Sequence, residues 1–366
     1  MTKLRDICRF QSGGTPSRGT PAYFNGNIPW ITTVALNGDV IDGNQAIEWI
    51  TDEAIAKSAA KIVPPHSVMI GTRVGIGKVA INSVPMSTSQ DIISLIGIDE
   101  NKWDKKFICH LITANKEHLN SQARGATIKG IKIEVIADLV LPEISVKEQA
   151  RVSEIIGKVD ALICMQQQMA RNLDQLIKSR FIELFGDCDL THPQESWVTI
   201  KEIGTVVGGA TPKTDHDEYW GGSYRWITPA ELDADSGYIY DSVRKLTKEG
   251  VESCSLQEMP VGTVILSSRA PIGKVAIAGN TFYCNQGFKN IICKKGITPR
   301  YLYTVLLLNV EYLNSLGRGA TFKEISKGIV ESIRIPVPSM ELQEQFAAFV
   351  EQTDKSKLCG MMEVAA

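Results

Sequence analysis

Short runs of apolar and β-branched residues, bounded by Gly and Pro, predict strands in both halves of the chain. Apolar residues at helical spacing predict helices over residues 107–119 and 299–316. Because strands and helices do not alternate regularly, the pattern favours α+β domains over a doubly wound sheet. The predicted strands are residues 67–74, 78–81 and 92–96 in the first half, and 263–267, 274–278 and 290–293 in the second.

A long helix is predicted to begin after Ser145, which forms a capping box with Glu148. Its apolar positions recur every 3.5 residues or so, which is typical of a coiled-coil seam, and Gly186 ends it. Some 38 residues of helix would extend on the order of 55 Å. A second helix starts at Met340, but its pattern fades after Val350, so we expect it to be about half as long. The seam positions of the first helix are Val152, Ile155, Ile156, Val159, Leu162, Ile163, Met169, Leu173, Leu176, Ile177, Phe181 and Leu184, with polar Gln166 and Arg180 among them.

The chain repeats itself once: residues 28–32 return as 224–228, an offset of 224 − 28 = 196. The other matching blocks keep their order: 13–16 with 208–212, 73–81 with 269–277, Gln90 with Gln286, 124–127 with 318–321, and 141–149 with 335–345. We therefore predict a tandem duplication, with a first domain over 1–144, a spacer helix over 145–186, a second domain over 187–339 and a second helix over 340–366. The stretches 37–64 and 232–260 do not match, as expected where a common scaffold presents variable loops. The two copies are called the first and second repeat below.

Charge and cysteine content narrow the class of protein. The net charge of the 366 residues is -2. Residues 1–145 carry 15 Lys/Arg against 14 Asp/Glu, and residues 191–340 carry 16 against 15, so each globular half is about +1. Any affinity for nucleic acid must therefore come from local clusters of basic residues. The eight cysteines form no Cys-x-x-Cys pair, the N-terminus has no apolar signal core and no apolar run could span a bilayer, which predicts a cytoplasmic protein.

Catalytic and metal-binding signatures are missing from the sequence. Residues 72–78 resemble a phosphate-binding loop, but Thr72 stands where that motif needs Gly, and Val79 where it needs Ser or Thr. We expect a β-hairpin turn there instead, with Gly residues at positive φ. The histidines show no metal spacing. Trp30 and Trp226, which we place at the start of a strand in each repeat, are expected in the core, with base stacking as the alternative.

The repeated polar residues are the candidates for contact with DNA. A hairpin tip bearing Arg and Lys can reach phosphates or guanine edges, and a loop with Arg, Lys, Thr and exposed backbone N–H groups suits phosphate. An ordinary solvated turn is the alternative for each loop, and a hydrogen-bonded core amide is the alternative for the two Gln residues, which could otherwise bind adenine. The candidates are Thr15, Arg18, Arg73, Lys78, Gln90, Arg124, Thr127 and Lys129 in the first repeat, and Thr211, Lys213, Arg269, Lys274, Gln286, Arg318, Thr321 and Lys323 in the second.

The order of domain, long helix, domain and second helix, together with these blocks, resembles the specificity subunit of type I restriction–modification enzymes. The blocks that carry the resemblance are Gly-Gly-x-Thr-Pro, Trp-Ile-Thr, Arg-x-x-x-Gly-Lys-Val and Arg-Gly-Ala-Thr, over essentially the whole chain. The resemblance implies two target-recognition domains that each bind one half of a split DNA sequence, and a coiled coil that sets the gap and docks methyltransferase subunits. It further implies that S-adenosylmethionine, ATP and Mg²⁺ belong to the partner subunits, that the restriction subunit joins through the methyltransferase, and that this chain binds double-stranded DNA without catalysis.

Two other functions fit parts of the sequence. A protein-binding scaffold on a helical rod would suit the near-neutral charge, and a self-contained enzyme with duplicated catalytic domains would suit the duplication alone. Salt-dependent DNA binding separates the first of these from a DNA-recognition subunit. Since the second helix is predicted to be short, we also expect part of the long seam to favour self-association or a partner helix.

Overall fold

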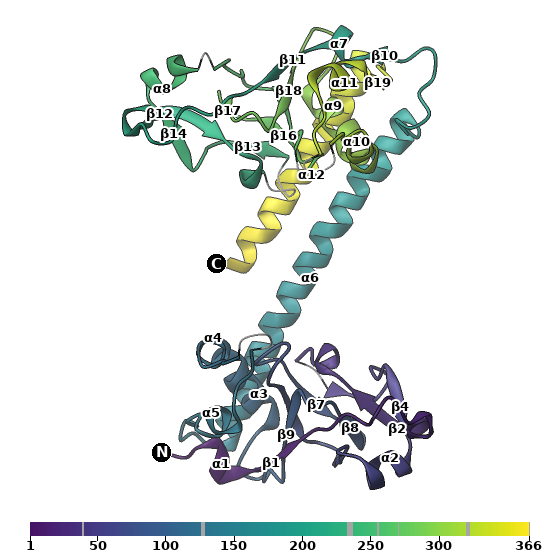
Figure 1. The fold of residues 1–366 in the computed structure, drawn as a ribbon, viewed down its shortest axis with the longest axis vertical. Coiled ribbons are helices and arrows are strands. Elements are labelled where there is room, and N and C mark those ends of the chain that lie inside the picture. The colour runs from purple at the N-terminus through teal and green to yellow at the C-terminus, as the bar shows by residue number, and fades with distance from the viewer. Residues whose placement is uncertain are drawn as a thin grey trace. The chain divides into compact units, whose positions relative to one another are not determined.

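The computed structural model describes residues 1–38, 40–125, 129–232, 237–254, 256–269, 271–319 and 323–365. The chain forms two compact units, Met1–Leu162 and Ile163–Ala366, and each combines β-sheets with helices, as predicted for α+β domains (Figure 1). The boundary between the units falls inside helix α6 (Val146–Phe185).

The first unit holds two sheets, with strand orders β1-β9-β6-β7-β3 and β4-β2-β8-β5. Pairing is antiparallel except between β3 and β7 and between β2 and β8. Ile92–Ile96 is a strand as predicted, whereas the strand predicted over 67–74 covers only Val68–Gly71 and the one predicted over 78–81 lies one residue later. The strands are β1 (Arg9–Ser12), β2 (Phe24–Ile31), β3 (Val40–Ile41), β4 (Glu48–Ile50), β5 (Ile62–Val63), β6 (Val68–Gly71), β7 (Val79–Asn82), β8 (Met86–Thr88) and β9 (Ile92–Ile96), and the short helices are α1 (Leu4–Ile7), α2 (Asp52–Lys57), α3 (Lys105–Ala114), α4 (Lys116–Ser121) and α5 (Ile133–Ala137).

The second unit repeats this topology. Its larger sheet has the order β11-β18-β15-β16-β13, the counterpart of β1-β9-β6-β7-β3, and a smaller sheet has the order β14-β12-β17. The duplication predicted from the sequence is thus confirmed in the fold. The strands are β10 (Val198–Thr199), β11 (Gly204–Gly208), β12 (Trp220–Ile227), β13 (Tyr238–Ile239), β14 (Arg244–Leu246), β15 (Val264–Leu266), β16 (Val275–Ala278), β17 (Tyr283–Cys284), β18 (Lys289–Cys293) and β19 (Arg334–Ile335), and the helices are α7 (Ile200–Ile203), α8 (Lys248–Ser253), α9 (Pro299–Leu308), α10 (Val310–Ser315), α11 (Lys327–Ser332) and α12 (Met340–Ala365).

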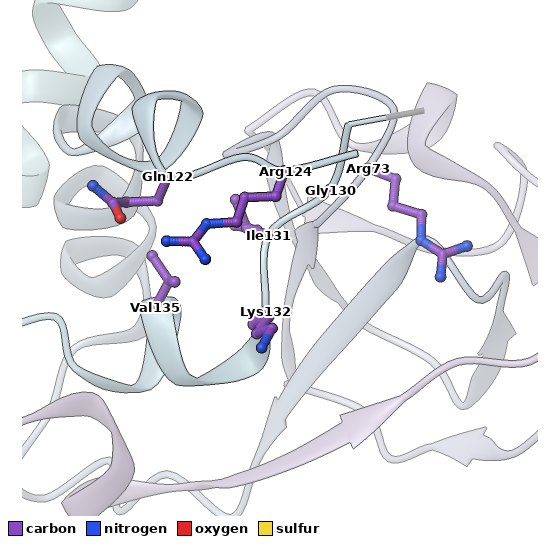
Figure 2. A pocket seen from close by; sticks show the side chains of 7 residues that line it. All are labelled: Arg73, Gln122, Arg124, Gly130, Ile131, Lys132 and Val135. Carbon is purple, nitrogen blue, oxygen red and sulfur yellow. The ribbon is translucent and has the colours of Figure 1, made fainter. Parts of the chain in front are cut away.

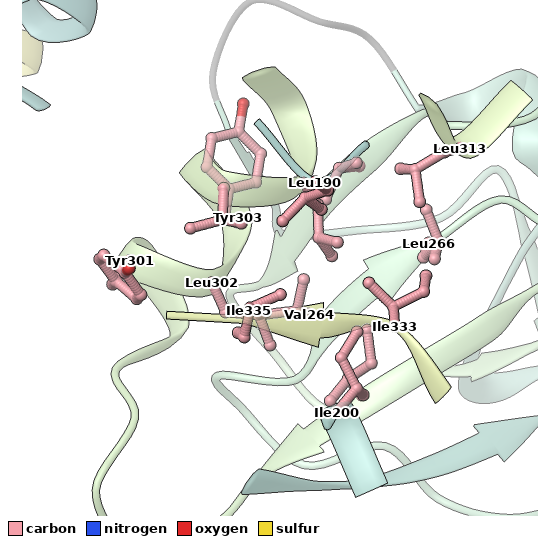
Figure 3. Close-up of a cluster of buried hydrophobic side chains, with 14 of the residues drawn as sticks. Leu190, Ile200, Val264, Leu266, Tyr301, Leu302, Tyr303, Leu313, Ile333 and Ile335 are labelled. Atoms are coloured by element: carbon pink, nitrogen blue, oxygen red, sulfur yellow. The ribbon is translucent and has the colours of Figure 1, made fainter. Parts of the chain in front are cut away.

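The central strands of each larger sheet are buried on both faces. All four residues of β6 and all four of β7 are buried. Alternate side chains of β6 enter different clusters: Val68 and Ile70 join the core that includes Ile108 of α3, and Met69 joins a separate one. In the second unit, side chains from β15, β19 and α9 point into one cluster (Figure 3). Burial on both faces explains why these strands appear in the sequence as continuous apolar runs without alternation.

The predicted helix 107–119 is in fact two helices, and so is 299–316. In each repeat an Asn ends the first helix: the amide Nδ2 of Asn115 donates to the carbonyl of Leu111 at 2.8 Å, and that of Asn309 to the carbonyl of Val305 at 2.9 Å. A side chain that bonds the backbone in this way competes with the helical ladder. The apolar spacing continues across the Asn, so the sequence pattern did not reveal the break.

Helix α6 begins and ends where the sequence predicted. The backbone N–H of Ser145 donates to Glu148 at 2.9 Å and the N–H of Glu148 donates to Ser145 Oγ at 3.3 Å, which confirms the capping box. Gly186 follows the last helical residue with φ +76°, a conformation that favours glycine after a helix.

A buried glutamine fastens the start of the helix that follows each repeat. Gln149 of α6 accepts from the N–H of Asp104 at 2.9 Å and donates to two carbonyls, and Gln343 of α12 accepts from the N–H of Thr298 at 2.8 Å and also donates to two carbonyls. Both side chains are fully buried. The sequence match of Gln149 with Gln345 was therefore wrong by two residues: Gln345 is exposed, and the structural counterpart is Gln343.

In the second unit, α12 packs antiparallel on the C-terminal part of α6. The Phe181 ring lies 5.3 Å from that of Phe346, and nearer the other end of α12 Lys357 pairs with Asp174 of α6. Helix α12 has 26 residues against 40 in α6, so the second helix is shorter by about a third and not by half. The prediction failed because the sequence 351–357 is polar, yet it stays helical through contacts such as that of Lys357.

Much of the apolar seam of α6 is exposed. Ile155, Leu162 and Met169 are 52%, 50% and 54% exposed, whereas Phe181 is fully buried. The polar seam residue Arg180 lies over the ring of Phe349 at 5.9 Å. Helix α12 therefore covers only the C-terminal part of the seam of α6. Within the described residues, no helix is both long enough and apolar enough to cross a membrane.

Candidate nucleic-acid interface

The turn between β6 and β7 is a hairpin, as predicted. Gly75 and Gly77 have φ of +74° and +77°, and the N–H of Gly71 donates to the carbonyl of Lys78 at 2.9 Å. The conformation places Arg73 and Lys78 on the surface, and the Arg73 guanidinium lies 3.5 Å from the Asp91 carboxylate. Both cations are exposed, but Arg73 has an internal partner in Asp91 that a ligand would have to replace.

The corresponding hairpin of the second repeat uses its cations differently. Lys274 donates to the carbonyl of Pro229 at 3.1 Å and is partly buried, whereas Lys78 is exposed. Arg269 donates to Glu324 at 3.1 Å. Lys78 and Lys274 occupy matching positions in the sequence, but within the part of the chain that the structure describes only Lys274 is held by a backbone carbonyl.

The Arg-Gly-Ala-Thr blocks belong to two loops, residues 124–130 and 318–324, which we call the arginine loops. Their parts 126–128 and 320–322, and with them Thr127 and Thr321, lie outside the described residues. The described ends are closed by paired backbone bonds of 3.0 Å, between Arg124 and Gly130 and between Arg318 and Glu324. Lys129, Arg318 and Lys323 are exposed.

Each arginine loop is fastened to its hairpin. The N–H of Ile131 donates to the carbonyl of Thr72 at 2.9 Å, and the N–H of Ile325 donates to the carbonyl of Ser268 at 2.9 Å. The tertiary structure thus brings together two blocks that lie about 50 residues apart in the sequence. The cations of both blocks share one surface in each repeat.

Two open hollows of about 580 and 560 Å³ lie beside the arginine loop of the first repeat. In Figure 2 the side chain of Arg124 reaches toward Gln122 and Val135, whereas the guanidinium of Arg73 lies on the other side of Gly130. The first hollow is lined by Arg73, Gln122, Arg124, Gly130, Ile131, Lys132 and Val135, and the second by Arg73, Gly75, Ile76, Lys116, Asn120, Ala123 and Lys129.

Lys116 and Lys132 were missed by the sequence reasoning. We selected candidates that recur in both repeats, and these two lysines have no basic counterpart in the second one. In the sequence, the only sign of their role is that they lie close to repeated blocks. That closeness matters only in the structure, where the first arginine loop lies beside α4 and α5.

The Gly-Gly-x-Thr-Pro blocks are tight turns against a strand. A Cβ on Gly13 would lie 2.1 Å from the carbonyl oxygen of Ser89, and one on Gly209 would lie 2.0 Å from that of Cys284, so no larger residue fits. The next residues accept hydrogen bonds from the buried indoles: Trp30 Nε1 donates to Gly14 at 3.0 Å, and Trp226 Nε1 donates to Ala210 at 3.1 Å.

Both tryptophans lie in the core, 4% and 3% exposed, as predicted. They lie near the ends of β2 and β12, so their placement at the start of a strand was wrong.

The polar residues of these turns reach the surface. Thr211 Oγ1 donates to Gln286 Oε1 at 2.6 Å, which brings together two blocks of the second repeat. Thr15 and Gln90 are exposed at the equivalent places. The alternative of a buried strand amide is therefore wrong for both Gln residues, which lie in turns on the surface.

Arg18 and Lys213 lie in the segments that follow these turns. Arg18 makes a two-pronged ion pair with Glu48, at 2.7 and 3.0 Å, and this pairing raises its pKa further. Lys213 is exposed, and its carbonyl accepts from Trp220 Nε1 at 3.2 Å. Arg18 thus has an internal partner that DNA would have to replace.

Among the described residues, no group of His, Cys, Asp and Glu side chains is arranged to hold a metal ion. The described cysteines make no disulfide bonds, and burial raises the pKa of the Cys109 and Cys284 thiols to about 12.

Residues 1–182 and 195–358 match the family described as the type I restriction modification DNA specificity domain. The chain belongs to this family. Its two matches correspond to the two repeats and reach into the helices that follow them.

Two curated relatives are named as specificity subunits of type I restriction enzymes. The chain is 42% identical over 185 residues to the type I restriction enzyme MjaIX specificity subunit of Methanocaldococcus jannaschii, covering 49% of this chain and 43% of that protein. It is 28% identical over 204 residues to the EcoR124I/EcoR124II specificity subunit of Escherichia coli, covering 54% and 49%. The matches thus span about half the length of these relatives.

The fold is similar to a solved structure of the family. The S subunit of the type I restriction–modification system from M. genitalium matches with a TM-score of 0.58, over all of this chain and 91% of that one. The sequence identity is 15%, so this likeness concerns the fold alone.

Proposed function

We propose that this chain is the DNA-recognition subunit of a type I restriction–modification enzyme, and that each repeat binds one half of a bipartite target. One observation carries the proposal. Both repeats have the same fold, and in each of them a hairpin and an arginine loop place cations on one surface. Two related binding domains in one chain suit a target with two different halves. The family match supports the same function.

The division of labour on this surface follows from general features of DNA recognition. Cations contact phosphates and position the protein, whereas side chains that reach base edges give specificity. The candidates of the arginine loops and hairpins suit the first task. The segments that differ between the repeats, 37–64 and 232–260, suit the second.

We further propose that α6 and α12 set the distance between half-sites and dock methyltransferase subunits, and that the restriction subunit joins through them. Exposed apolar side chains on α6, such as Ile155, Leu162 and Met169, support a protein partner, because large apolar patches on a surface mark interaction sites. In this proposal S-adenosylmethionine, ATP and Mg²⁺ bind to the partner subunits, and this chain is not catalytic. Self-association through the same side chains is the alternative use of this face.

The test is a fluorescence-anisotropy titration of the full chain with random-sequence duplex DNA between 50 and 200 mM salt, with and without a methyltransferase subunit. Lys129→Gln should weaken binding and lower the salt slope by about 0.9, since one phosphate contact is lost. Lys61→Gln, at an exposed lysine that directly precedes β5 of the smaller sheet in the same unit, is the matched control and should change little. Salt-independent binding, or no binding in any condition, would move the function to a protein scaffold.

The docking proposal has its own test. Leu162→Asp and Met169→Asp place charges on the exposed seam without touching the DNA surface. Sedimentation velocity with the methyltransferase subunit should show loss of the complex for these variants. Unchanged complex formation would refute docking on this face, and loss of a dimer of the chain alone would assign the face to self-association.

A further inference from the structure

The described residues beside the two arginine loops make matching contacts, so they can be compared position by position. A Cβ on Gly77 would lie 3.1 Å from the Lys116 side chain, and one on Gly273 would lie 2.9 Å from Val310, which makes Lys116 and Val310 equivalent. Lys132 precedes α5 as Ser326 precedes α11. Gly130 bonds Arg124 as Glu324 bonds Arg318.

This comparison shows that the first repeat is the more basic one. Its two hollows are lined by Arg73, Lys116, Arg124, Lys129 and Lys132. At the same positions the second repeat has Arg269, Val310, Arg318, Lys323 and Ser326. Two exposed positive charges are therefore absent from the second surface. The second repeat has Lys289 where the first has Ile93, but this lysine is only 14% exposed and is paired with Glu324. Within the described part of the chain, none of Lys116, Arg124, Lys129 and Lys132 has a carboxylate at ion-pair distance.

In addition, the hairpin arginine of each repeat has a carboxylate nearby, and the carboxylate of the second repeat is the closer one. The Glu324 carboxylate lies 3.1 Å from Arg269 Nε and 3.1 Å from Lys289 Nζ. Burial raises the pKa of Glu324, but the bonds and charges of these two cations outweigh burial and keep the pKa below its usual range. The group is thus ionised at neutral pH, and a phosphate that approaches Arg269 must compete with it. At the same place the first repeat has Gly130, which has no side chain, and its Arg73 lies 3.5 Å from the Asp91 carboxylate instead.

We infer that the two repeats bind the DNA backbone unequally: the first repeat supplies most of the salt-dependent affinity, and Glu324 restrains the second by occupying its Arg269. The inference rests on the proposed function and deepens it. It commits to the phosphodiester backbone, because the cations of the first repeat lie on both sides of the arginine loop (Figure 2). Cations placed in this way suit successive phosphates of a polyanion better than one free phosphate.

The inference is tested by exchanging the charges between the repeats of the full chain. Gly130→Glu installs the carboxylate in the first repeat, where the nearest obstacle is the flexible Arg73 side chain at 3.0 Å, and Gly130→Gln controls for size. Glu324→Gln removes the charge from the second repeat at nearly constant shape. Anisotropy titrations with random-sequence duplex at 50 to 200 mM salt measure the slope of log Kd against log salt.

One phosphate contact corresponds to a slope of about 0.9, so the ratio of Kd at 200 mM to Kd at 50 mM changes about 3.5-fold per contact. We expect Gly130→Glu to lower this ratio by that factor and to weaken binding, with Gly130→Gln close to wild type. We expect Glu324→Gln to raise the ratio by a similar factor and to tighten binding, because Arg269 is released.

The outcomes separate this inference from the proposed function. If the wild type binds with a steep salt slope but neither Gly130→Glu nor Glu324→Gln changes it, the inequality of the repeats is refuted while DNA recognition stands. If the wild type shows no salt-dependent binding, DNA recognition itself fails. Inorganic phosphate, compared with chloride at equal ionic strength, should not compete with the DNA, and specific competition by millimolar phosphate would instead indicate a site for a single anion.

A second exchange avoids the loop altogether. The double variant Lys116→Val and Lys132→Ser gives the first repeat the residues of the second at two exposed positions. It should lower the salt slope by up to about 1.8, for two contacts. Circular dichroism and thermal melting confirm that each variant is folded, and a folded double variant with an unchanged slope would overturn the inference.

Discussion

The buried glutamine at the start of α12 offers a strong test of how the spacer helices are fixed to the repeats. Gln343→Leu replaces the amide by an apolar group of similar size. One N–H, of Thr298, and two carbonyls, of Gly296 and Pro338, then lose the partner that the fully buried Gln343 side chain gives them, and these three residues are themselves partly buried. A buried polar group left without a hydrogen bond costs about 1–3 kcal/mol.

Because the three groups are only partly buried, we take about 1–2 kcal/mol for each, or about 3–6 kcal/mol in all, from which better burial of the Leu side chain subtracts about 1 kcal/mol. We therefore expect a loss of about 4 kcal/mol. With an urea dependence of about 2.5 kcal/mol per M, this lowers the unfolding midpoint by about 1.5 M.

The assay is urea unfolding, together with hydrogen exchange read by mass spectrometry over α9 and the first turns of α12. Exchange should accelerate there and stay unchanged in residues 1–144. The matched control is Gln345→Leu, the same substitution two residues later on the exposed face of the same helix. A midpoint shift for Gln343→Leu no larger than that of Gln345→Leu would refute the reasoning, and with it the role of this amide as the anchor of α12.

Three further predictions concern other parts of the chain. Ser145→Ala should lower the free energy of unfolding by about 1 kcal/mol, because it removes the cap of α6. Hydrogen bonds from Ser145 lower the pKa of Glu148, so the stability that the cap contributes is present above the usual carboxyl pKa of 4.5 and is lost as the pH falls through the lowered value. Circular dichroism against pH measures this loss. Gly209→Ala should destabilise the second repeat by about 2–3 kcal/mol in thermal unfolding, because its Cβ would lie 2.0 Å from a carbonyl oxygen, and a neutral effect would contradict the tight turn. In the native protein a maleimide should label exposed Cys164 quickly and buried Cys284 only after unfolding, since burial raises the Cys284 thiol pKa to about 12; equal labelling rates by mass spectrometry would disprove this.

The sequence alone determined the duplication, the fold class, the limits of α6 and the hairpin turns. These are properties that local chemistry or spacing decides. A Ser followed three residues later by a Glu, at the start of a helical apolar pattern, forms a capping box through local hydrogen bonds, and Gly75 and Gly77 permit a turn that other residues resist. The burial of Trp30 and Trp226 could also be predicted, because a large aromatic ring at the same position of both repeats indicates a residue of the shared core.

What the sequence missed depends on contacts between distant segments. Gln149 and Gln343 are equivalent because both side chains make the same three hydrogen bonds, and only the tertiary structure shows these bonds. Asn115 divides a helix whose apolar spacing is unbroken, because its amide bonds the helix backbone.

The candidate interface shows the same division. Sequence repetition identified the cations that the two repeats share, since chance does not preserve them in order. It could not show that Arg269 is held by Glu324, that Lys274 is turned to a carbonyl, or that Lys116 and Lys132 join only the first surface. Whether a cation is available to DNA depends on which carboxylates and carbonyls the fold brings within a few ångströms, and those partners lie up to 55 residues away along the chain.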